Sequence, residues 1–165
     1  MPEAWLRGPL PGVPPELMPV AHALVQARED IERVTAGTTV EELWQRPGGA
    51  APAGYHLQHL AGSLDRLLTY ARGEALSERQ RAALAREAEP GAPAQLLAAG
   101  AVQMIDRSLE QLRDTRAEGL LEGRGVGRAQ LPSTVLGLLY HAAEHTTRHV
   151  GQLITTLNVV KGGKK

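Results

Sequence analysis

Residues 141–152, HAAEHTTRHVGQ, form the stretch from which the fold and the candidate site are interpreted. This stretch places three histidines, His141, His145 and His149, at intervals of four residues. Because an α-helix completes a turn in about 3.6 residues, side chains four positions apart lie on one face of a helix. Apolar residues before and after the histidines continue that face, so the imidazoles interrupt a hydrophobic stripe. Imidazoles one turn apart can bind the same metal ion, and the spacing therefore predicts a metal site on a long helix.

Composition limits the class of protein and the kind of metal site. The 165 residues are enough for one domain with a hydrophobic core. Lys plus Arg and Asp plus Glu each number 18, and this net charge of zero predicts no nucleic-acid partner and no membrane partner. The chain has no cysteine, so a metal must bind nitrogen or oxygen ligands. No segment has the length of a membrane span or the pattern of a signal peptide, and we expect a cytoplasmic protein.

The apolar residues predict helices. The chain has no phenylalanine and only 3% aromatic residues, so leucine, alanine and valine must fill its core. Leucine and alanine favour helices, and runs of β-branched and aromatic residues that would indicate strands are missing. Apolar residues recur at helical spacing in four stretches: residues 16–36, 55–71, 94–116 and, after a cap at Ser133, 134–158. We therefore predict an all-α protein, a four-helix bundle, in which facing helices build metal and ligand sites.

The two ends of the chain are expected to lie outside the bundle. Residues 1–15 contain five of the 11 prolines and predict an irregular arm, held against the body by Trp5 and Leu6. Residues 16–160 are expected to form the bundle domain. Residues 161–165 are rich in lysine and glycine and predict a solvated tail.

The connections between the long helices have their own signals. Thr39 and Glu42 have the spacing of a capping box, which predicts a short helix that ends before Pro47. Residues 74–93 are charged and rich in alanine, then interrupted by proline, and predict a loop with a helical piece. Residues 117–130 are rich in glycine and arginine and predict a loop.

The expected second helix offers two histidines as a further ligand, His56 and His59. The apolar face of this helix contains Leu57, Leu60, Ala61, Leu64 and Leu68. His56 borders that face and His59 lies to its side, so helical geometry leaves the choice open with a slight preference for His56. His22, in the first helix, is expected to be a packing residue or cavity wall.

Two segments resemble the DinB-like family, also called the DinB/YfiT-like metalloenzymes: HLQHLAGSLDRLLTYARGE at residues 56–74 and PSTVLGLLYHAAEHTTRHVGQLITT at residues 132–156. The resemblance covers roughly residues 16–156. It implies an up-down-down-up four-helix bundle. It also implies a metal bound by one histidine of the second helix and by both histidines of an HxxxH pattern in the fourth, often followed by x-Gly-Gln.

Residue by residue, the resemblance selects three ligands. His145 and His149, followed by Val-Gly-Gln, match the pattern of the fourth helix. His59, followed by Leu60 and later by Asp65, matches the histidine of the second helix. The resemblance therefore implies His59, His145 and His149 as metal ligands, and it favours His59 over His56.

Four further residues border the expected ligand face: His141, Glu144, Arg148 and Gln152. His141 matches no ligand of the family and is expected to be a pocket wall or a hydrogen-bond partner of a ligand. Glu144 is expected to form a salt bridge or to accept a hydrogen bond from a ligand. Arg148 and Gln152 are expected to orient a substrate or to lie solvated at the mouth of the bundle.

The ligand set indicates an open metal site. Three neutral imidazoles leave a divalent ion with its full charge and at least one free coordination position, as in catalytic sites. Such an ion lowers the pKa of bound water or polarises a thiol. Zinc and nickel suit imidazole ligands best, and iron also suits them. The resemblance implies thiol-dependent transferases or isomerases that use a low-molecular-weight thiol, with a small molecule as substrate.

The sequence leaves two functions open. One is a metal-dependent enzyme, a thiol transferase or a hydrolase. The other is a non-catalytic stress-response protein that binds a metal or a small ligand. No catalytic residue is identified, because the histidines lack the glutamate that serves as general base in HExxH peptidases. Apolar residues on more than one flank of the second helix, together with the resemblance, predict a homodimer.

Overall fold

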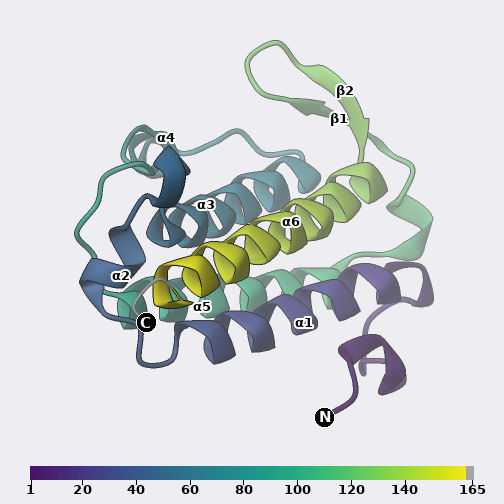
Figure 1. Cartoon of the computed structure of the whole chain (residues 1–165). Coiled ribbons are helices and arrows are strands. Elements are labelled where there is room, and N and C mark those ends of the chain that lie inside the picture. Colours follow the sequence, from purple (N-terminus) through teal and green to yellow (C-terminus); the bar gives the residue numbers. More distant parts are fainter. Residues whose placement is uncertain (163–165) are drawn as a thin grey trace.

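The computed structural model describes residues 1–162, which are mostly helical (Figure 1). Four long helices make up most of the molecule: α1 (Met18–Thr35), α3 (Ala53–Ala71), α5 (Ala94–Asp114) and α6 (Val135–Gly162). Shorter helices lie outside them: α2 (Val40–Trp44), α4 (Glu78–Ala85) and the 3₁₀ helices Ala4–Leu6, Pro15–Leu17, Pro47–Gly49 and Ala117–Gly119. The predicted long helices are confirmed, with small shifts at their ends.

The packing of the long helices places the two histidine-rich helices side by side. α3 packs against α6 and α5, and α1 packs against the same two helices. The contact between α3 and α6 is the most extensive one among the described elements. Both helices contribute almost fully buried leucines to the core: Leu57, Leu60, Leu64 and Leu68 on α3, with Leu139, Leu153 and Leu157 on α6. This pairing allows histidines from distant parts of the sequence to meet.

A small β-hairpin spans the end of the loop predicted at residues 117–130 and the predicted cap Ser133, which lies in a strand instead. Strand β1 (Gly123–Val126) pairs antiparallel with β2 (Leu131–Thr134), directly before α6. These segments carry no strand signal because they are short and contain residues such as Gly125 and Pro132, which are depleted in sheets. The hairpin projects from the helical body (Figure 1).

The N-terminal arm is attached by other residues than those expected. Trp5 and Leu6 are 62% and 57% exposed, so they bury little surface against the body. Ala4 and Val13 are buried instead. The backbone N–H of Ala4 donates to Oε1 of Gln26 over 3.0 Å, which ties the arm to α1.

The fourth long helix continues beyond its predicted end at residue 158. α6 continues to Gly162, and Nζ of Lys161 donates to Oγ1 of Thr38 over 2.9 Å. Lys161 therefore contacts the chain just beyond α1. Residues 163–165 of the expected tail lie outside the described residues.

Capping boxes begin both short α-helices. The predicted box of Thr39 and Glu42 is confirmed at the start of α2. A second box, formed by Ser77 and Gln80, begins α4, the helical piece expected in residues 74–93. Nε2 of Gln80 also donates to Oδ2 of Asp65 over 2.9 Å, so α4 is docked on the outer side of α3.

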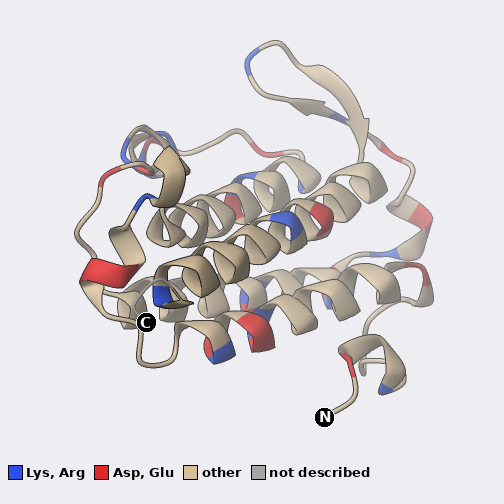
Figure 2. Ribbon diagram, in the orientation of Figure 1, with Lys and Arg blue, Asp and Glu red and all other residues tan. Residues whose placement is uncertain are grey.

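Charged residues are interspersed over the surface. Figure 2 shows basic and acidic residues mixed along the helices rather than gathered by sign. None of the helices within residues 1–162 is both long enough and apolar enough to cross a membrane.

Candidate metal centre

Three histidines from two helices converge between α3 and α6. His59 lies in the first half of α3, and His145 and His149 lie one turn apart on α6. One nitrogen of each ring lies within 4.8 Å of the others. The Nε2 atoms of His59 and His145 are 3.0 Å apart. The ring centroid of His149 is 4.6 Å from that of His59 and 4.5 Å from that of His145. The structure thus brings together the three histidines that the resemblance implied as ligands.

This spacing suits a small divalent ion. Zinc binds imidazole nitrogen at about 2.0–2.1 Å, which separates two tetrahedral ligands by about 3.4 Å. The Nε2 atoms of His59 and His145 are 3.0 Å apart and the three ligand nitrogens all lie within 4.8 Å, so side-chain adjustments would place them around one ion. Two neutral imidazoles that face each other through Nε2 can share only one proton, and a metal ion removes that restriction because it binds both lone pairs.

Burial favours the neutral form of His145 and His149. His149 is 9% exposed, and burial lowers its pKa from 6.5 to about 4, with smaller contributions from the nearby rings of His145, His59 and His56. Burial also lowers the pKa of His145, and the adjacent His59 adds to that effect. Neutral imidazoles are the form that binds a metal, so these two rings are competent at neutral pH.

Behind His59 lies a carboxylate that sequence analysis did not identify. Glu87, in the turn after α4, places Oε2 2.8 Å from Nδ1 of His59. Its other oxygen pairs with Nη1 of Arg66, which lies two helical turns beyond His59 on α3. Glu87 is 8% exposed, which is unusual for a glutamate. The ring of Tyr55 stacks on His59 with a centroid distance of 5.4 Å.

Behind His149 lies His56, the residue that helical geometry slightly favoured as a ligand. Its Nδ1 atom lies 3.0 Å from Nδ1 of His149, and its side chain is buried. Burial lowers the pKa of His56, and the nearby His59 contributes. Nδ1 of His149 is thus occupied by His56, and Nε2 is the nitrogen that remains for a metal.

His145 differs from the other two candidate ligands. Its Nδ1 atom is buried and has no hydrogen-bond partner among the described residues. The protein therefore fixes the orientation of two rings through their second nitrogen, and it leaves the third ring without such a contact.

The four neighbouring residues predicted from the sequence, His141, Glu144, Arg148 and Gln152, lie on α6 with His145 and His149. His141 is exposed, and its Nδ1 atom lies 3.2 Å from Oε2 of Glu144. Glu144 also pairs with Arg148, which lowers the pKa of its carboxyl group. Gln152 is exposed. The ring of His141 lies 5.5 Å from that of His145, centroid to centroid, so it borders the site without a hydrogen bond to that ring.

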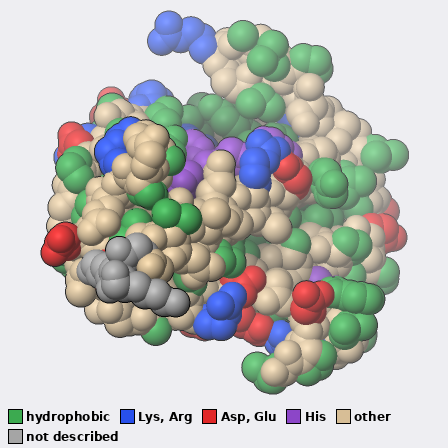
Figure 3. Space-filling view, in the orientation of Figure 1, with side chains coloured by type: hydrophobic (Ala, Val, Ile, Leu, Met, Phe, Trp, Pro, Cys, Tyr) green, Lys and Arg blue, Asp and Glu red, His purple; other side chains and the backbone are tan. Residues whose placement is uncertain are grey.

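The site is open to the surface on one side. The side chain of His59 is 20% exposed. Figure 3 shows histidine side chains in a recess of the surface, next to a basic and an acidic side chain. The ring of His59 is therefore accessible from solvent, whereas that of His149 is buried. His22 lies apart from this recess and places Nε2 2.9 Å from the carbonyl oxygen of Gly8.

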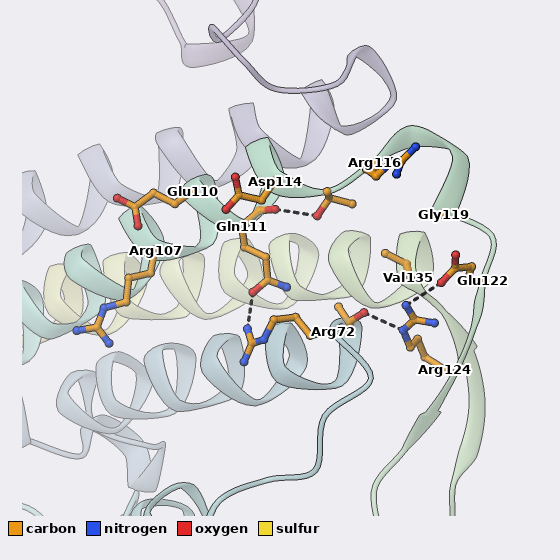
Figure 4. Close-up of a pocket in the computed structure, with 12 residues that line it drawn as sticks. Arg72, Arg107, Glu110, Gln111, Asp114, Arg116, Gly119, Glu122, Arg124 and Val135 are labelled. Atoms are coloured by element: carbon orange, nitrogen blue, oxygen red, sulfur yellow. Dashed lines mark hydrogen bonds and ion pairs between the residues drawn. The ribbon is translucent and has the colours of Figure 1, made fainter.

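A separate cavity of about 530 Å³ lies near the far end of α3, and no histidine lines it (Figure 4). Its charged residues are Arg72, Arg107, Glu110, Asp114, Arg116, Glu122 and Arg124. Arg124 pairs with Glu122 over 3.0 Å, and Nη1 of Arg72 donates to Oε1 of Gln111. The charges of this cavity thus largely compensate one another, and the cavity is not part of the histidine site.

Comparisons with known proteins agree with this fold. The sequence model of the DinB superfamily matches residues 23–153. The structure is similar to a conserved protein of Enterococcus faecalis, with a TM-score of 0.67, 19% identity and coverage of 88% of this chain and 97% of that one. It is also similar to a DinB-like protein of Bacillus cereus, with a TM-score of 0.62, 19% identity and coverage of 82% and 86%. None of the curated proteins matches the sequence. The chain belongs to the DinB superfamily.

Proposed function

We propose that this protein binds a divalent metal ion through one nitrogen each of His59, His145 and His149. The observation that supports the proposal is the convergence of three imidazole nitrogens, from two helices, within 4.8 Å of one another. Zinc and nickel are the favoured ions, and iron is the next candidate, because all three accept imidazole ligands.

We further propose that the bound site is catalytic, as a thiol transferase or a hydrolase acting on a small molecule. An ion held by three neutral imidazoles supplies Lewis-acid chemistry toward water or a thiol. The chain has no cysteine, so a reacting thiol comes from a bound low-molecular-weight thiol. The exposed guanidinium of Arg148, at the rim, offers a contact for an anionic group of such a ligand. Gln152 offers an amide on the same helix.

The alternative is a non-catalytic protein that binds a metal or a small ligand in a stress response. The positions of the nearby carboxylates favour it. Glu87 lies behind His59 and is held by Arg66, while Glu144 is held by Arg148. Neither carboxylate is therefore free to take a proton at the open side of the three rings.

Elemental analysis of the purified protein tests metal binding directly. We expect about one equivalent of zinc or nickel in the wild type and little in the His145→Ala variant. The metal-loaded protein is then screened for thiol transfer from common low-molecular-weight thiols to electrophilic small molecules, with His145→Ala as control. Metal without activity in any thiol or hydrolysis assay supports the non-catalytic function, whereas an absence of bound metal contradicts the proposal as a whole.

We also infer an up-down-down-up arrangement of the four long helices. Figure 1 supports it: the sequence colours run in one direction along α1 and α6 and in the opposite direction along α3 and α5. A long connection, which contains α4, joins the two parallel neighbours α3 and α5.

A homodimer is part of the proposal, although for a different reason than the sequence suggested. The flanks of α3 are covered by α4, α5 and α6. Two adjoining cavities of about 400 and 420 Å³, lined mostly by apolar residues, instead lie between α1 and α6. Tyr140 lines the cavity of about 420 Å³ and is exposed. Light scattering of the wild type at micromolar concentration should give twice the mass of the chain. Tyr140→Glu should lower this measured mass. A monomer mass for the wild type would contradict the dimer.

A further inference from the structure

We infer that Glu87 is a positioning residue of the metal site, which selects the tautomer of His59 that can bind the ion. This inference rests on the proposed metal-binding function and deepens it. Glu87 belongs to the connection between α4 and α5, outside both helices that provide the ligands. Glu87 is not proposed as a ligand, and its effect on metal binding comes through its hydrogen bond to the ring of His59.

The tautomer follows from the hydrogen bonds. A carboxylate accepts hydrogen bonds and cannot donate them, so Oε2 of Glu87, 2.8 Å from Nδ1 of His59, requires the proton on Nδ1. A neutral ring with its proton on Nδ1 has its lone pair on Nε2. Nε2 is the atom that faces His145 at 3.0 Å, inside the group of three rings. Histidines that bind metals commonly use such a carboxylate contact, which also fixes the orientation of the ring.

Arg66 holds the carboxylate in place. Nη1 of Arg66 pairs with Oε1 of Glu87, so that each oxygen of the carboxylate has one partner. The side chains of Arg66 and Glu87 are only 11% and 10% exposed, which limits their movement. His59 and Arg66 lie seven residues apart on one face of α3 and thus form a fixed receptor for a single carboxylate.

A glycine on α3 makes room for this contact. Gly62 lies between His59 and Arg66 on the helix, and a Cβ atom at this position would overlap the carboxylate of Glu87. The same Cβ would lie 2.8 Å from Nη1 of Arg66. Gly62 therefore permits the close approach of Glu87, and an alanine at this position would require the carboxylate to move.

The connection that contains Glu87 is tied to α3 on both sides of the site. Nε2 of Gln58, the residue before His59, donates to the carbonyl oxygen of Glu89 over 2.9 Å. Upstream, Gln80 of α4 donates to Asp65 over 2.9 Å. Glu87 therefore lies in a segment whose position relative to α3 is set by several hydrogen bonds.

Two matched glycine variants test the contact without removal of a polar group. Gly62→Ala displaces the carboxylate of Glu87, whereas Gly100→Ala changes a glycine of α5 at which an added Cβ would have no atom within 4 Å. We expect zinc affinity, measured by competition with a chelator, to fall about 10- to 100-fold in Gly62→Ala and in Glu87→Ala, and to stay at the wild-type value in Gly100→Ala. Circular dichroism spectra of the three variants should match that of the wild type, which shows that they are folded.

Glu87→Gln separates a tautomer effect from a packing effect. The guanidinium of Arg66 requires the oxygen of the new amide, which turns the amide NH₂ toward Nδ1 of His59 and favours the wrong tautomer. We expect this variant to lose about as much zinc affinity as Glu87→Ala despite its similar shape. The double variant Arg66→Met with Glu87→Gln frees the amide to rotate and should recover part of the affinity, a result that a purely structural role would not give.

The ¹⁵N chemical shifts of the His59 ring test the inference directly, because they show which ring nitrogen carries the proton. In the metal-free protein, ¹⁵N chemical shifts should show the Nδ1–H tautomer of His59 in the wild type and a mixture in Glu87→Ala. If the wild type binds no zinc, the proposed function fails, and the ¹⁵N shifts alone then decide the role of Glu87. Folded Glu87→Ala and Gly62→Ala variants with wild-type zinc affinity, or an unchanged His59 tautomer in Glu87→Ala, would overturn the inference.

Discussion

The Nδ1 atoms of His56 and His149 lie 3.0 Å apart, in the buried part of the contact between α3 and α6. One of two neutral imidazoles donates in such a bond and the other accepts. If Nε2 of His149 binds the metal, its Nδ1–H must donate to the Nδ1 lone pair of His56. His56 then holds the ring of His149 through its second nitrogen, as Glu87 holds that of His59, although only the carboxylate is restricted to accepting.

This contact changes the expected effect of His56→Ala. Helical geometry and the family resemblance leave His56 either as a ligand or as a residue without effect on the metal. The structure places it against the far side of a ligand, and the loss of such a partner typically costs about 10- to 100-fold in metal affinity. Chelator competition with zinc should show a loss of that size. His22→Ala serves as control, because His22 bonds to the carbonyl oxygen of Gly8 and does not belong to the group of three rings. Equal affinities of the two variants would contradict the role given to His56.

Alanine substitution of the three ligands should have a much larger effect. We expect His59→Ala, His145→Ala and His149→Ala each to lower zinc affinity by orders of magnitude, because each removes one of three protein ligands. His141→Ala should change affinity little, since His141 is exposed and bonds to Glu144 rather than to a ligand. Competition with a chelator measures the zinc affinity of all four variants. Retention of zinc by His59→Ala together with its loss in His56→Ala would exchange the roles of these two residues.

The metal-free protein should lose stability as the pH falls below 6.5. The pKa of His149 is lowered from 6.5 to about 4 in the folded state, so the unfolded chain binds a proton more readily than the folded protein between these values. Proton binding therefore favours the unfolded chain in this range. The loss of stability due to His149 is complete below about pH 4. A shift of this size corresponds to roughly 3 kcal/mol for one group. The lowered pKa values of His145 and His56 act in the same direction.

Urea unfolding of the metal-free protein at several pH values measures this dependence. His149→Asn removes the group with the largest shift and should flatten the dependence between pH 6.5 and 4. Zinc binding should also persist somewhat below pH 6.5, because the lowered pKa values keep His145 and His149 neutral there. A free energy of unfolding that rises as the pH is lowered from about 6.5 to about 5 in the wild type would contradict the assignment of buried neutral imidazoles.

The parts that could be predicted from the sequence are those with a local signal. The spacing of leucines gives the long helices, and the HxxxH spacing of His145 and His149 places two ligands on one face. The third ligand required the resemblance, because the helical wheel slightly favoured His56 over His59. In the structure both rings are near the site, one inside the group of three and one behind it.

The features that the sequence did not predict depend on contacts between distant segments of the chain. Glu87 is one glutamate in a charged stretch, and neither its spacing nor its neighbours distinguish it from Glu89. Its function emerges only when the connection after α4 folds back onto α3. The hairpin before α6 was missed for a related reason: pairing across a turn stabilises two short segments that contain glycine and proline.

Gly54, at the start of α3, provides a stability prediction that also tests the packing beside the site. A Cβ atom at Gly54 would lie 2.7–2.8 Å from three atoms of the indole ring of Trp44. That ring cannot move aside easily, because its Nε1–H donates to the carbonyl oxygen of Ala92 over 3.0 Å. Gly54→Ala should therefore destabilise the protein by about 1–3 kcal/mol, the usual cost of overpacking. Gly100→Ala should instead stabilise it by up to about 1 kcal/mol, since only the helical preference of alanine acts there. Urea unfolding of both variants measures the difference, and a stabilised Gly54→Ala protein would show that Trp44 does not pack against α3 as described.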